Sequence, residues 1–383
     1  MNSASRDIRC SICGTIAIDD LPLFHHLHRI TSDCRPWPPG GRLGVCRSCN
    51  AVQKPADSGF LADTEAIYRS YSIYHQGGGA EQSVFQSTSG LSASRSAQLL
   101  DRFHRRVPLL RSGRFLDIGC GNGATLRAFG DLRPDWIKCG TEFDARHAGA
   151  IAEIPNTLPL HTGPLDDLPG VFDVITMVHV LEHLPDPVAW LASLRHAIAA
   201  NGVLLIEVPY HAANPFDLVI ADHRTHFTAV SLEDCLHRAG YDVMMLSTDW
   251  IPRELSAVAR PANNEVPSST PEDATAVRTR VSDALRWLRG AADSVNALGA
   301  TGELGIFGTS IAGTWLASQA HTRIAFFVDE DSQRIGRVHL GRPVLAPQDV
   351  PQGSHVYVGL PTDLARAIGH RLARPGITFV TPT

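Results

Sequence analysis

One stretch constrains this chain more than any other: Arg114-Phe-Leu-Asp-Ile-Gly-Cys-Gly-Asn-Gly123, an apolar run that leads into three closely spaced glycines. The run Arg114–Ile118 predicts a short strand, and Ala124–Phe129 predicts a helix that opens directly after the glycines. A strand, a glycine turn and a helix N-terminus together direct backbone N–H groups at a ligand. The sequence therefore predicts an α/β domain with a ligand site at this turn.

The spacing of the glycines and the residue ahead of them indicate the kind of ligand. Dinucleotide sites use G-x-G-x-x-G, whereas Gly119, Gly121 and Gly123 form G-x-G-x-G. The carboxylate of Asp117, just ahead of them, would repel a pyrophosphate. It favours a ligand with an ammonium group and a ribose but no phosphate. S-adenosylmethionine (SAM) has these features, and we expect Asp117, Gly119 and Gly121 to bind it.

The run D-I-G-C-G-N-G resembles the first motif of the class I SAM-dependent methyltransferases. Three later stretches match strands of that family in the same order: Ile137–Glu142, Phe172–Met177 and Asn201–Pro209. The resemblance implies that Glu142 accepts the ribose hydroxyls and that His179 borders the methyl-donating sulfur. It also implies that Asp166 or its neighbour Asp167, in a loop after a third short strand, accepts the adenine amine. A glycine turn in some other α/β domain is the alternative interpretation.

Composition limits the remaining possibilities. The chain has 383 residues, enough for two or three domains, and a net charge of -5 with 19% charged residues. It therefore offers no broad basic face to nucleic acid or membrane, and no apolar run approaches the ~20 residues that span a bilayer. The N-terminus lacks the apolar core of a signal peptide. We expect a cytoplasmic protein with reduced thiols, so its eight cysteines need a role other than disulfides.

Four cysteines form two C-x-x-C pairs, a pattern typical of a structural zinc site: Cys10, Cys13, Cys46 and Cys49. Two such pairs close a tetrahedral thiolate cage around Zn²⁺. With four sulfur ligands the site would be structural, and it would hold together a module too small to bury a core of its own. Free cysteines at this spacing by coincidence, or a redox pair, are the alternatives. A nearby trio, His25, His26 and His28, is interpreted as a solvated loop rather than as a second metal site.

Two clusters of histidines and acids follow core strands. The first, His179-Val-Leu-Glu182-His183, matches the H-x-x-E-H pattern of some zinc proteases. We reject that interpretation because a buried strand precedes the cluster and Pro185 follows it, which leaves no room for the required helix. Glu182 and His183 are expected to fix the turn by hydrogen bonds. A divalent metal held by these two and another histidine stays open.

The second cluster is Asp222-His223-Arg-Thr-His226-Phe227, in a long loop after a core strand. An acid beside a histidine can hold the imidazole as a general base. Loops over the carboxyl ends of parallel strands are the usual place for a site. The alternative is that these are ordinary surface residues. We expect Asp222 and His223 to act in catalysis.

The whole chain is similar in its arrangement to the bacterial nucleotide-sugar C-methyltransferases, which combine a zinc module, a tyrosine–glycine segment, a SAM core and a small C-terminal domain. The resemblance implies catalytic roles for Tyr74 and for the pair Asp222-His223, with His179 beside the cofactor. It differs at Asp222, where glutamate is usual, and at His226, where an aromatic residue is common. The implied reaction is C-methylation of a nucleotide-linked keto-sugar, in which His223 removes a proton and Tyr74 stabilises the enolate.

Two other functions stay possible at this point. The same residues would serve an O-methyltransferase that acts on a sugar or another small metabolite, with or without a metal. More remotely, the chain could be a non-catalytic SAM-fold module whose zinc unit binds a partner. Asp117 and Glu142 favour an enzyme, since a degenerate scaffold needs neither.

We expect five segments along the chain, which give a class I methyltransferase (Rossmann-like) core between a zinc-binding module and a smaller Rossmann-like α/β domain. They are 1–55 (zinc module), 56–110 (helical or lid segment), 111–260 (SAM core), 261–298 (linker and bridging helix) and 299–383 (C-terminal domain). The last begins with a second strand–glycine turn, Leu304–Gly313, but its glycines miss the dinucleotide spacing. We expect it to pack on the core and to contact the substrate, with an NAD-type cofactor as the alternative.

Overall fold

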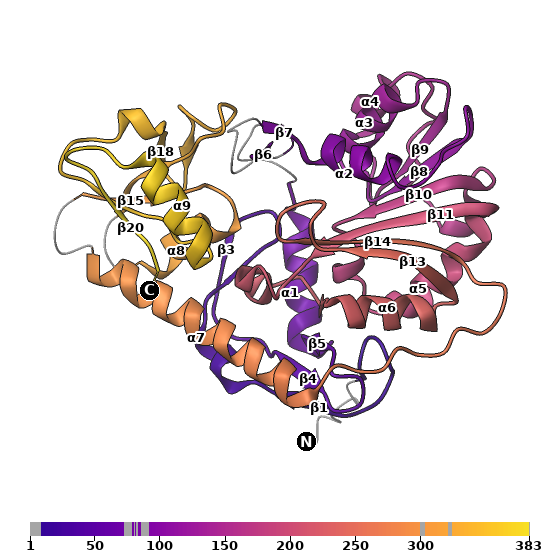
Figure 1. Ribbon diagram of the computed structural model, residues 1–383, viewed down its shortest axis with the longest axis horizontal. Helices are drawn as coiled ribbons and strands as arrows, with labels where there is room; N and C mark the ends of the chain where they lie inside the picture. The colour runs from indigo at the N-terminus through magenta and orange to yellow at the C-terminus, as the bar shows by residue number, and fades with distance from the viewer. Residues whose placement is uncertain are drawn as a thin grey trace.

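The computed structural model describes residues 9–72, 79, 81, 83–85, 92–298, 303–320 and 324–382. Tyr74, predicted to be catalytic, lies outside them. The described residues form two six-stranded sheets and one four-stranded sheet, with two short hairpins. Figure 1 shows the central sheet at the right, the C-terminal unit at the upper left and the N-terminal strands below.

The central sheet has the strand order β13-β14-β11-β10-β8-β9. Its strands are β8 (Arg114–Ile118), β9 (Ile137–Thr141), β10 (Phe172–Val178), β11 (Ile198–Pro209), β13 (Tyr241–Ser247) and β14 (Glu254–Pro261). β8 to β11 pair in parallel, while β13 and β14 are antiparallel. This order is the class I methyltransferase fold, and it confirms the predicted fold class. The predicted third short strand is represented by bridges from β9 to Thr157 and His161.

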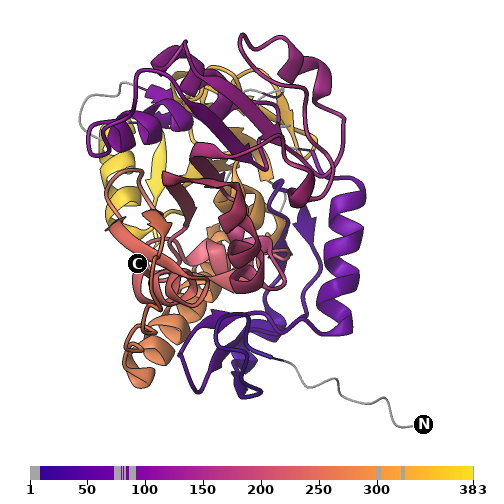
Figure 2. The same ribbon diagram turned by 90° about the vertical axis from the view of Figure 1, so that its right-hand side faces the viewer.

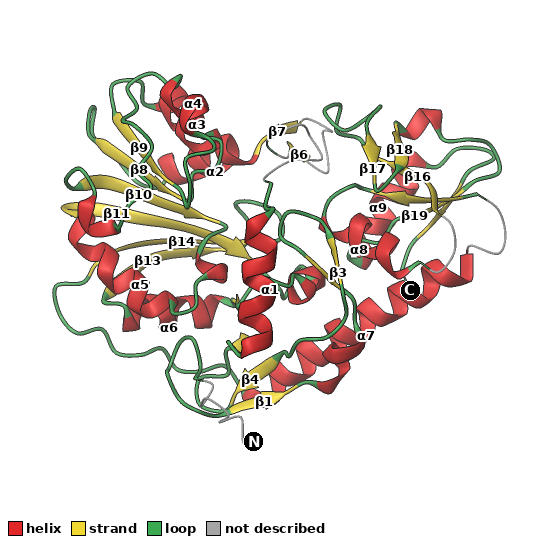
Figure 3. Ribbon diagram, turned by 180° about the vertical axis from the view of Figure 1, so that it is seen from behind, coloured by secondary structure: helices red, strands yellow, loops and turns green. Residues whose placement is uncertain are grey.

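Helices cover both faces of this sheet (Figure 3). They are α2 (Arg95–His104), α3 (Ala124–Leu132), α4 (Ala148–Ala152), α5 (Pro187–Leu194) and α6 (Ala229–Arg238). Because successive side chains of a strand point to opposite faces, Phe115 packs with α2 and α3 while its neighbour Leu116 packs with α5 and α6. The sheet is therefore apolar on both sides, and its polar residues gather at the strand ends.

The N-terminal sheet joins two distant parts of the chain. Its order is β1-β4-β5-β12, with β1 (Ile18–Asp20), β4 (Gly44–Cys46), β5 (Val52–Gln53) and β12 (Thr225–His226). β12 belongs to the loop that carries the second histidine cluster, so this loop is pinned to the cysteine module. The remaining N-terminal elements are β2 (Arg29–Ile30), β3 (Pro36–Trp37), α1 (Ser58–Arg69), β6 (Ser83–Phe85) and β7 (Ser92–Ser94).

The C-terminal unit has the strand order β17-β18-β16-β15-β19-β20. It contains β15 (Leu304–Phe307), α8 (Ile311–Gln319), β16 (Ile324–Val328), β17 (Val338–His339), β18 (Arg342–Leu345), β19 (His355–Tyr357), α9 (Thr362–Leu372) and β20 (Thr378–Val380). The long helix α7 (Ala274–Leu298) runs beside the N-terminal strands toward this unit (Figures 1 and 2). An ion pair between Arg278 and Asp19 fixes it there. In the part of the chain that the structure describes, no helix is long and apolar enough to cross a membrane.

Candidate active site

The glycine turn after β8 has the backbone shape that a bound ligand requires. Gly119, Gly121 and Gly123 have φ angles of 67°, 52° and 85°, a region that side chains disfavour. A Cβ on Gly119 would also lie 2.5 Å from a methyl group of Val180. Glu142, at the end of β9, accepts hydrogen bonds of 2.8 Å from the backbone N–H groups of Gly121 and Phe143. The structure thus brings the predicted ribose-binding acid to the turn.

Asp117 lies beneath this turn and is 2% exposed. Its Oδ1 accepts a 2.6 Å hydrogen bond from Thr176, but its Oδ2 has no hydrogen-bond partner among the described residues. Burial raises the pKa of Asp117 to about 7. A buried carboxylate oxygen without a partner is costly, and an ammonium group would satisfy it. The residues present therefore fit the amino group of SAM.

The segment before β7 approaches the same turn. Asn122 donates a 2.6 Å hydrogen bond to the carbonyl of Gly79, and Glu81 accepts hydrogen bonds from Ser96 at the start of α2. The described residues of this segment therefore lie against the glycine turn. That placement is compatible with the predicted lid, although the role of Tyr74 stays a prediction.

His179 occupies a strained position at the end of β10. Its φ of 55° is unusual for a residue other than glycine, and such strain clusters at functional sites. Leu181–His183 form a single 3-10 turn, which confirms that the H-x-x-E-H pattern is not on an α-helix. Nδ1 of His179 lies 3.2 Å from Glu182 and its Nε2 lies 3.5 Å from Glu254. Burial lowers the pKa of His179, so the ring is neutral.

Three buried glutamates surround His179, and the sequence had indicated only the first of them: Glu182, Glu207 and Glu254. Burial raises the pKa of Glu182 and that of Glu207 to about 8, and it also raises the pKa of Glu254. Arg95 contacts Glu207 at 3.2 Å and also pairs with Glu254. Several oxygens of these glutamates lack a hydrogen-bond partner within the described residues. The cluster is therefore suited to a positively charged group nearby.

Asp217 is the acid that holds His223, and sequence reasoning missed it. Its Oδ1 lies 2.7 Å from Nδ1 of His223, and its Oδ2 lies 2.7 Å from Nδ1 of His226. Burial alone would raise the pKa of Asp217, but the two histidines outweigh it and hold the pKa below its usual range. Likewise, burial would lower the pKa of His223, yet Asp217 raises it. This aspartate sits in an apolar run, Phe216–Val219, that gives no signal of a site.

Asp222 has a different partner from the one predicted. Its carboxylate accepts hydrogen bonds of 2.9 and 2.5 Å from the backbone N–H and hydroxyl of Ser32, and it lies 3.4 Å from His183. The expectation that Asp222 orients His223 is thus corrected, because Asp217 is the acid bonded to Nδ1 of His223, while the charge of Asp222 only adds to the raised pKa of that ring. The rings of His183 and His223 are 4.6 Å apart, edge to face. The carboxylate of Asp222 therefore contacts His183 rather than His223.

A tyrosine of the described region also reaches the histidines. The ring of Tyr68, on α1, lies 6.2 Å from that of His183 and stacks on Tyr71. Burial raises the pKa of Tyr68 well above its ordinary value, and Asp222 and Glu182 add to this effect. Its hydroxyl is therefore a donor.

Three of these side chains offer metal-ligand atoms within 4.8 Å of one another: Glu182, His183 and His223. His183 and His223 use Nδ1 for hydrogen bonds to Asp222 and Asp217, so Nε2 is the atom each directs at this point. The same Nε2 atom of His223 is the one that a general base uses. The arrangement can therefore serve either a cation or proton transfer at that atom.

The four cysteines of the two C-x-x-C pairs come together as predicted: Cys10, Cys13, Cys46 and Cys49. Cys10 and Cys49 have their sulfurs 3.5 Å apart, as do Cys13 and Cys46. Gln53 donates a 3.0 Å hydrogen bond to the sulfur of Cys10 and accepts one from the backbone of Ser11. Four sulfurs at this spacing fit one tetrahedral metal ion.

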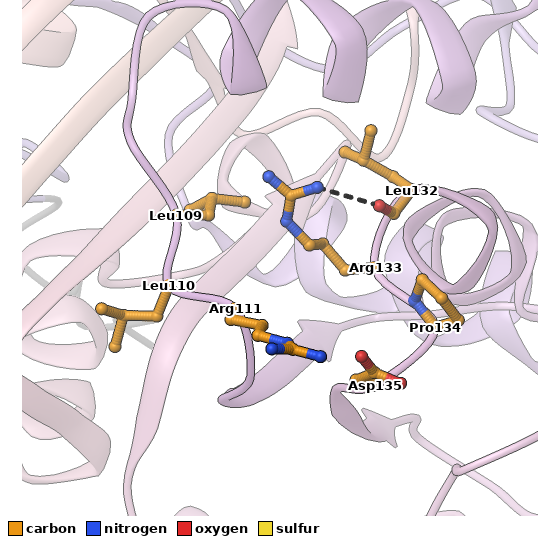
Figure 4. Close-up of a pocket in the computed structure, with 7 residues that line it drawn as sticks. All are labelled: Leu109, Leu110, Arg111, Leu132, Arg133, Pro134 and Asp135. Carbon is orange, nitrogen blue, oxygen red and sulfur yellow. Dashed lines mark hydrogen bonds between the residues drawn. The ribbon is translucent and has the colours of Figure 1, made fainter.

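Other predicted features lie apart from this centre. The side chain of Asp166 is 89% exposed, 3.9 Å from His196, so its adenine-binding role stays a prediction. A surface pocket of about 390 Å³ lies at the amino ends of β8 and β9, between the segments Leu109–Arg111 and Leu132–Asp135 (Figure 4). Since the glycine turn is at the carboxyl end of β8, this pocket is remote from the cluster.

Comparisons with known proteins agree with the fold. Residues 92–246 match the family model described as "Methyltransferase domain". A ubiquinone biosynthesis O-methyltransferase from Xylella fastidiosa is 31% identical over 134 residues, which cover 32% of this chain and 51% of that protein. An uncharacterized protein from Synechococcus is 35% identical over 112 residues, which cover 27% of each chain. The chain thus spans about half the length, or less, of these curated relatives.

Solved structures include a TehB-like SAM-dependent methyltransferase from Corynebacterium glutamicum, with 18% identity and a TM-score of 0.36, covering 52% of this chain and 99% of that one. An N,N-8-amino-8-demethyl-D-riboflavin dimethyltransferase from Streptomyces davawensis has 22% identity and a TM-score of 0.37, covering 43% of this chain and 54% of that one. The strand order and the family match define residues 92–246 as a methyltransferase domain with the class I fold.

Proposed function

We propose that this protein transfers a methyl group from SAM to a small-molecule acceptor. The observation that carries the proposal is the oxygen of Asp117, which is buried beside the glycine turn without a partner among the described residues. An ammonium group restores its interaction, and Glu142 stands one strand away for the ribose. SAM supplies an activated methyl group when bound, so the chain itself has to position and deprotonate the acceptor.

The finer proposal is C-methylation of a nucleotide-linked keto-sugar, and the histidine cluster supports it. His223 removes the proton from the carbon next to the carbonyl through Nε2, while Asp217 stabilises the imidazolium that forms. The electrons of the C–H bond pass into an enolate, whose carbon takes the methyl group as the sulfur–carbon bond breaks. Tyr74 or Tyr68 donates a hydrogen bond to the enolate oxygen. His223 then releases its proton to water.

Incubation with candidate nucleotide keto-sugars in D₂O tests this proposal. With S-adenosylhomocysteine present, the wild-type protein is expected to exchange the proton next to the carbonyl for deuterium. With SAM, mass spectrometry and NMR are expected to show a new carbon–carbon bond. Methyl transfer to a hydroxyl group, without deuterium exchange, would instead establish an O-methyltransferase.

O-methyl transfer is the second candidate because the curated relatives include proteins named ubiquinone biosynthesis O-methyltransferase. Glu182 and His183 would then hold a divalent cation against the acceptor oxygen. Dialysis against a chelator separates the candidates. It should abolish metal-assisted O-methylation, whereas the base mechanism needs no metal at these residues; the position of the new methyl group identifies an O-methyltransferase that works without metal.

We also propose that the four cysteines hold one structural Zn²⁺. Elemental analysis is expected to find one zinc per chain, and Cys46→Ser, at a fully buried ligand, should lose it. The melting temperature should fall by several degrees because the sheet β1-β4-β5-β12 loses its anchor. Zinc retained in Cys46→Ser would contradict this assignment. Cys34→Ser, at a surplus cysteine, is the control.

A further inference from the structure

Lys54 directly follows β5, and its side chain enters the histidine cluster. It is 2% exposed, an uncommon position for a lysine. Its Nζ lies 2.8 Å from Nε2 of His226 and donates a 3.1 Å hydrogen bond to the carbonyl of His223. Lys54 is thus fixed to both histidines that Asp217 contacts.

The donors and acceptors around Asp217 have one consistent set of directions. An ammonium group only donates, so Nε2 of His226 accepts from Lys54 and the ring carries its proton on Nδ1. That Nδ1–H donates to Oδ2 of Asp217, and Nδ1–H of His223 donates to Oδ1 in the same way. Nε2 of His223 is then the lone pair that the cluster presents to a substrate.

The carboxylate of Asp217 bonds to both His223 and His226, but only the ring of His226 is also bonded to the ammonium group of Lys54. That charge disfavours a second proton on His226. Protonated His226 would neutralise Asp217 and leave no negative charge to support His223. Burial and then the charge of Lys54 lower the pKa of His226 to about 3, so this ring stays neutral. Burial also lowers the pKa of Lys54 to about 7, so its ammonium form persists up to neutral pH.

Several elements contribute the other charged and titratable groups around these histidines. They are Arg29 in β2, His179 after β10, Glu182 and His183 in the 3-10 turn, Asp222 in the turn before β12, and Glu254 in β14. Asp222 is held by Ser32, and Glu254 pairs with Arg95. The cation that hydrogen-bonds His226 is Lys54.

We propose that Lys54 is a positioning residue which, through His226 and Asp217, selects His223 as the histidine that accepts the substrate proton. This inference rests on the proposed function, in which His223 is the base. It also gives the cysteine module a part in the active site. Gln53 points to the sulfur of Cys10, and the next residue, Lys54, points to the histidines, as neighbours along a strand do.

Histidine protonation can be measured without a substrate. Full-length protein labelled with ¹⁵N-histidine is examined by two-bond ¹H–¹⁵N correlation spectra between pH 6 and 8, with His223→Gln and His226→Gln to assign the rings. In the wild type, both rings are expected to carry a proton on Nδ1, and His226 should stay neutral. In Lys54→Met, which keeps the stem but removes the charge, the pKa of His226 is expected to rise, so that with the titration extended down to pH 4 it takes up a second proton at a higher pH than in the wild type. An unchanged His226 signal in Lys54→Met would overturn the inference.

Proton exchange provides the kinetic test. Lys54→Met is expected to slow deuterium exchange into the keto-sugar by about 10²-fold with little change in KM, because the base is misplaced rather than the substrate. Lys54→Arg, which keeps the charge and the donors, should recover most of the rate. Equal losses in both variants together with a lower melting temperature would indicate a purely structural role and refute the proposal. If wild-type protein exchanges no proton while the spectra behave as expected, the keto-sugar proposal fails together with the catalytic role of Lys54, and only its control of histidine protonation stands.

Discussion

The chain contains two strand–glycine turn–helix units, and they differ in how their acids are used. In the first, after β8, Oδ2 of Asp117 is buried without a hydrogen-bond partner among the described residues. In the second, after β15, the acid is Asp329, which follows β16 as Glu142 follows β9, and both of its oxygens are occupied. Oδ2 accepts from the backbone N–H and hydroxyl of Thr309, and Oδ1 accepts from the backbone of Asp331. The first turn is built for a ligand, and the second is closed by its own residues.

The glycines of the second turn have a packing role. A Cβ on Gly313 would lie 1.9 Å from the carbonyl oxygen of Gly308, so α8 can approach the turn only with glycine there. Arg334 closes the turn further by a 3.1 Å hydrogen bond to Thr309. Asp329 stands where Glu142 stands in the first unit, but besides a backbone N–H it also engages the Thr309 hydroxyl and Arg334, so it is less available to a ribose than Glu142. Glycine spacing shows where backbones come close, and the unsatisfied acid shows where a ligand belongs.

Among the substitutions at the two turns, removing the charge of Asp117 should have the largest effect on SAM affinity. Asp117→Asn is expected to weaken SAM binding by about 10- to 100-fold, since a hydrogen bond between charged groups contributes about 1.5–3 kcal/mol. Isothermal titration calorimetry measures this directly. Binding as tight as that of the wild type would show that Asp117 does not hold the ammonium group, and the two turns would then be alike.

Glu142→Gln should have a smaller effect. Glu142 keeps its bonds to the backbone at the turn and adds acceptors for two ribose hydroxyls, so the variant is expected to bind SAM about tenfold more weakly. A SAM analogue without the 2′- and 3′-hydroxyls provides the control. It should bind the variant and the wild type with nearly equal affinity, and a full tenfold difference for this analogue would place the ribose elsewhere.

The sequence predicted the parts of the site that local patterns define. The glycine turn, Asp117 and the four cysteines are encoded within short stretches, and the structure brings each group together. Asp222 and His223 were paired because they are neighbours. Their side chains diverge instead, to Ser32 and to Asp217.

Other parts of the site depend on long-range pairing that no local pattern reveals. Lys54 and His226 are 172 residues apart and meet because β5 pairs with β12. β12 has two residues, too few for a recognisable alternation. Asp217 lies in an apolar stretch whose burial is visible in the sequence, but its two histidine partners are set by the turn at Ile220–His223. The fold of the core was therefore predictable from the sequence, while the contacts that hold His223 and His226 were not.

The pH dependence of SAM binding tests whether Asp117, at the first glycine turn, binds the ligand as an ionised carboxylate. Burial raises the pKa of Asp117 to about 7, so below this pH the carboxyl group is mostly protonated and neutral. An ammonium group binds the ionised form, so binding releases a proton there, and affinity should fall by up to about tenfold from pH 7 to pH 6. Calorimetry in buffers of different ionisation enthalpy detects the released proton. Asp117→Asn should show no such dependence, and a flat wild-type profile would mean that Asp117 is ionised throughout.

Asp329→Asn, at the acid that the second turn engages with its own residues, should leave SAM binding unchanged. Its cost should appear in stability, because the backbone N–H and hydroxyl of Thr309 lose a charged acceptor and Arg334 loses part of its partner. A loss of about 1–3 kcal/mol is expected, seen as a melting temperature lower by several degrees. Asp117→Asn should have the opposite profile, with weak SAM binding and little loss of stability, since removing an unpaired buried charge relieves a cost. If Asp329→Asn weakened SAM binding as much as Asp117→Asn does, the second turn would be part of the site rather than a closed structural unit.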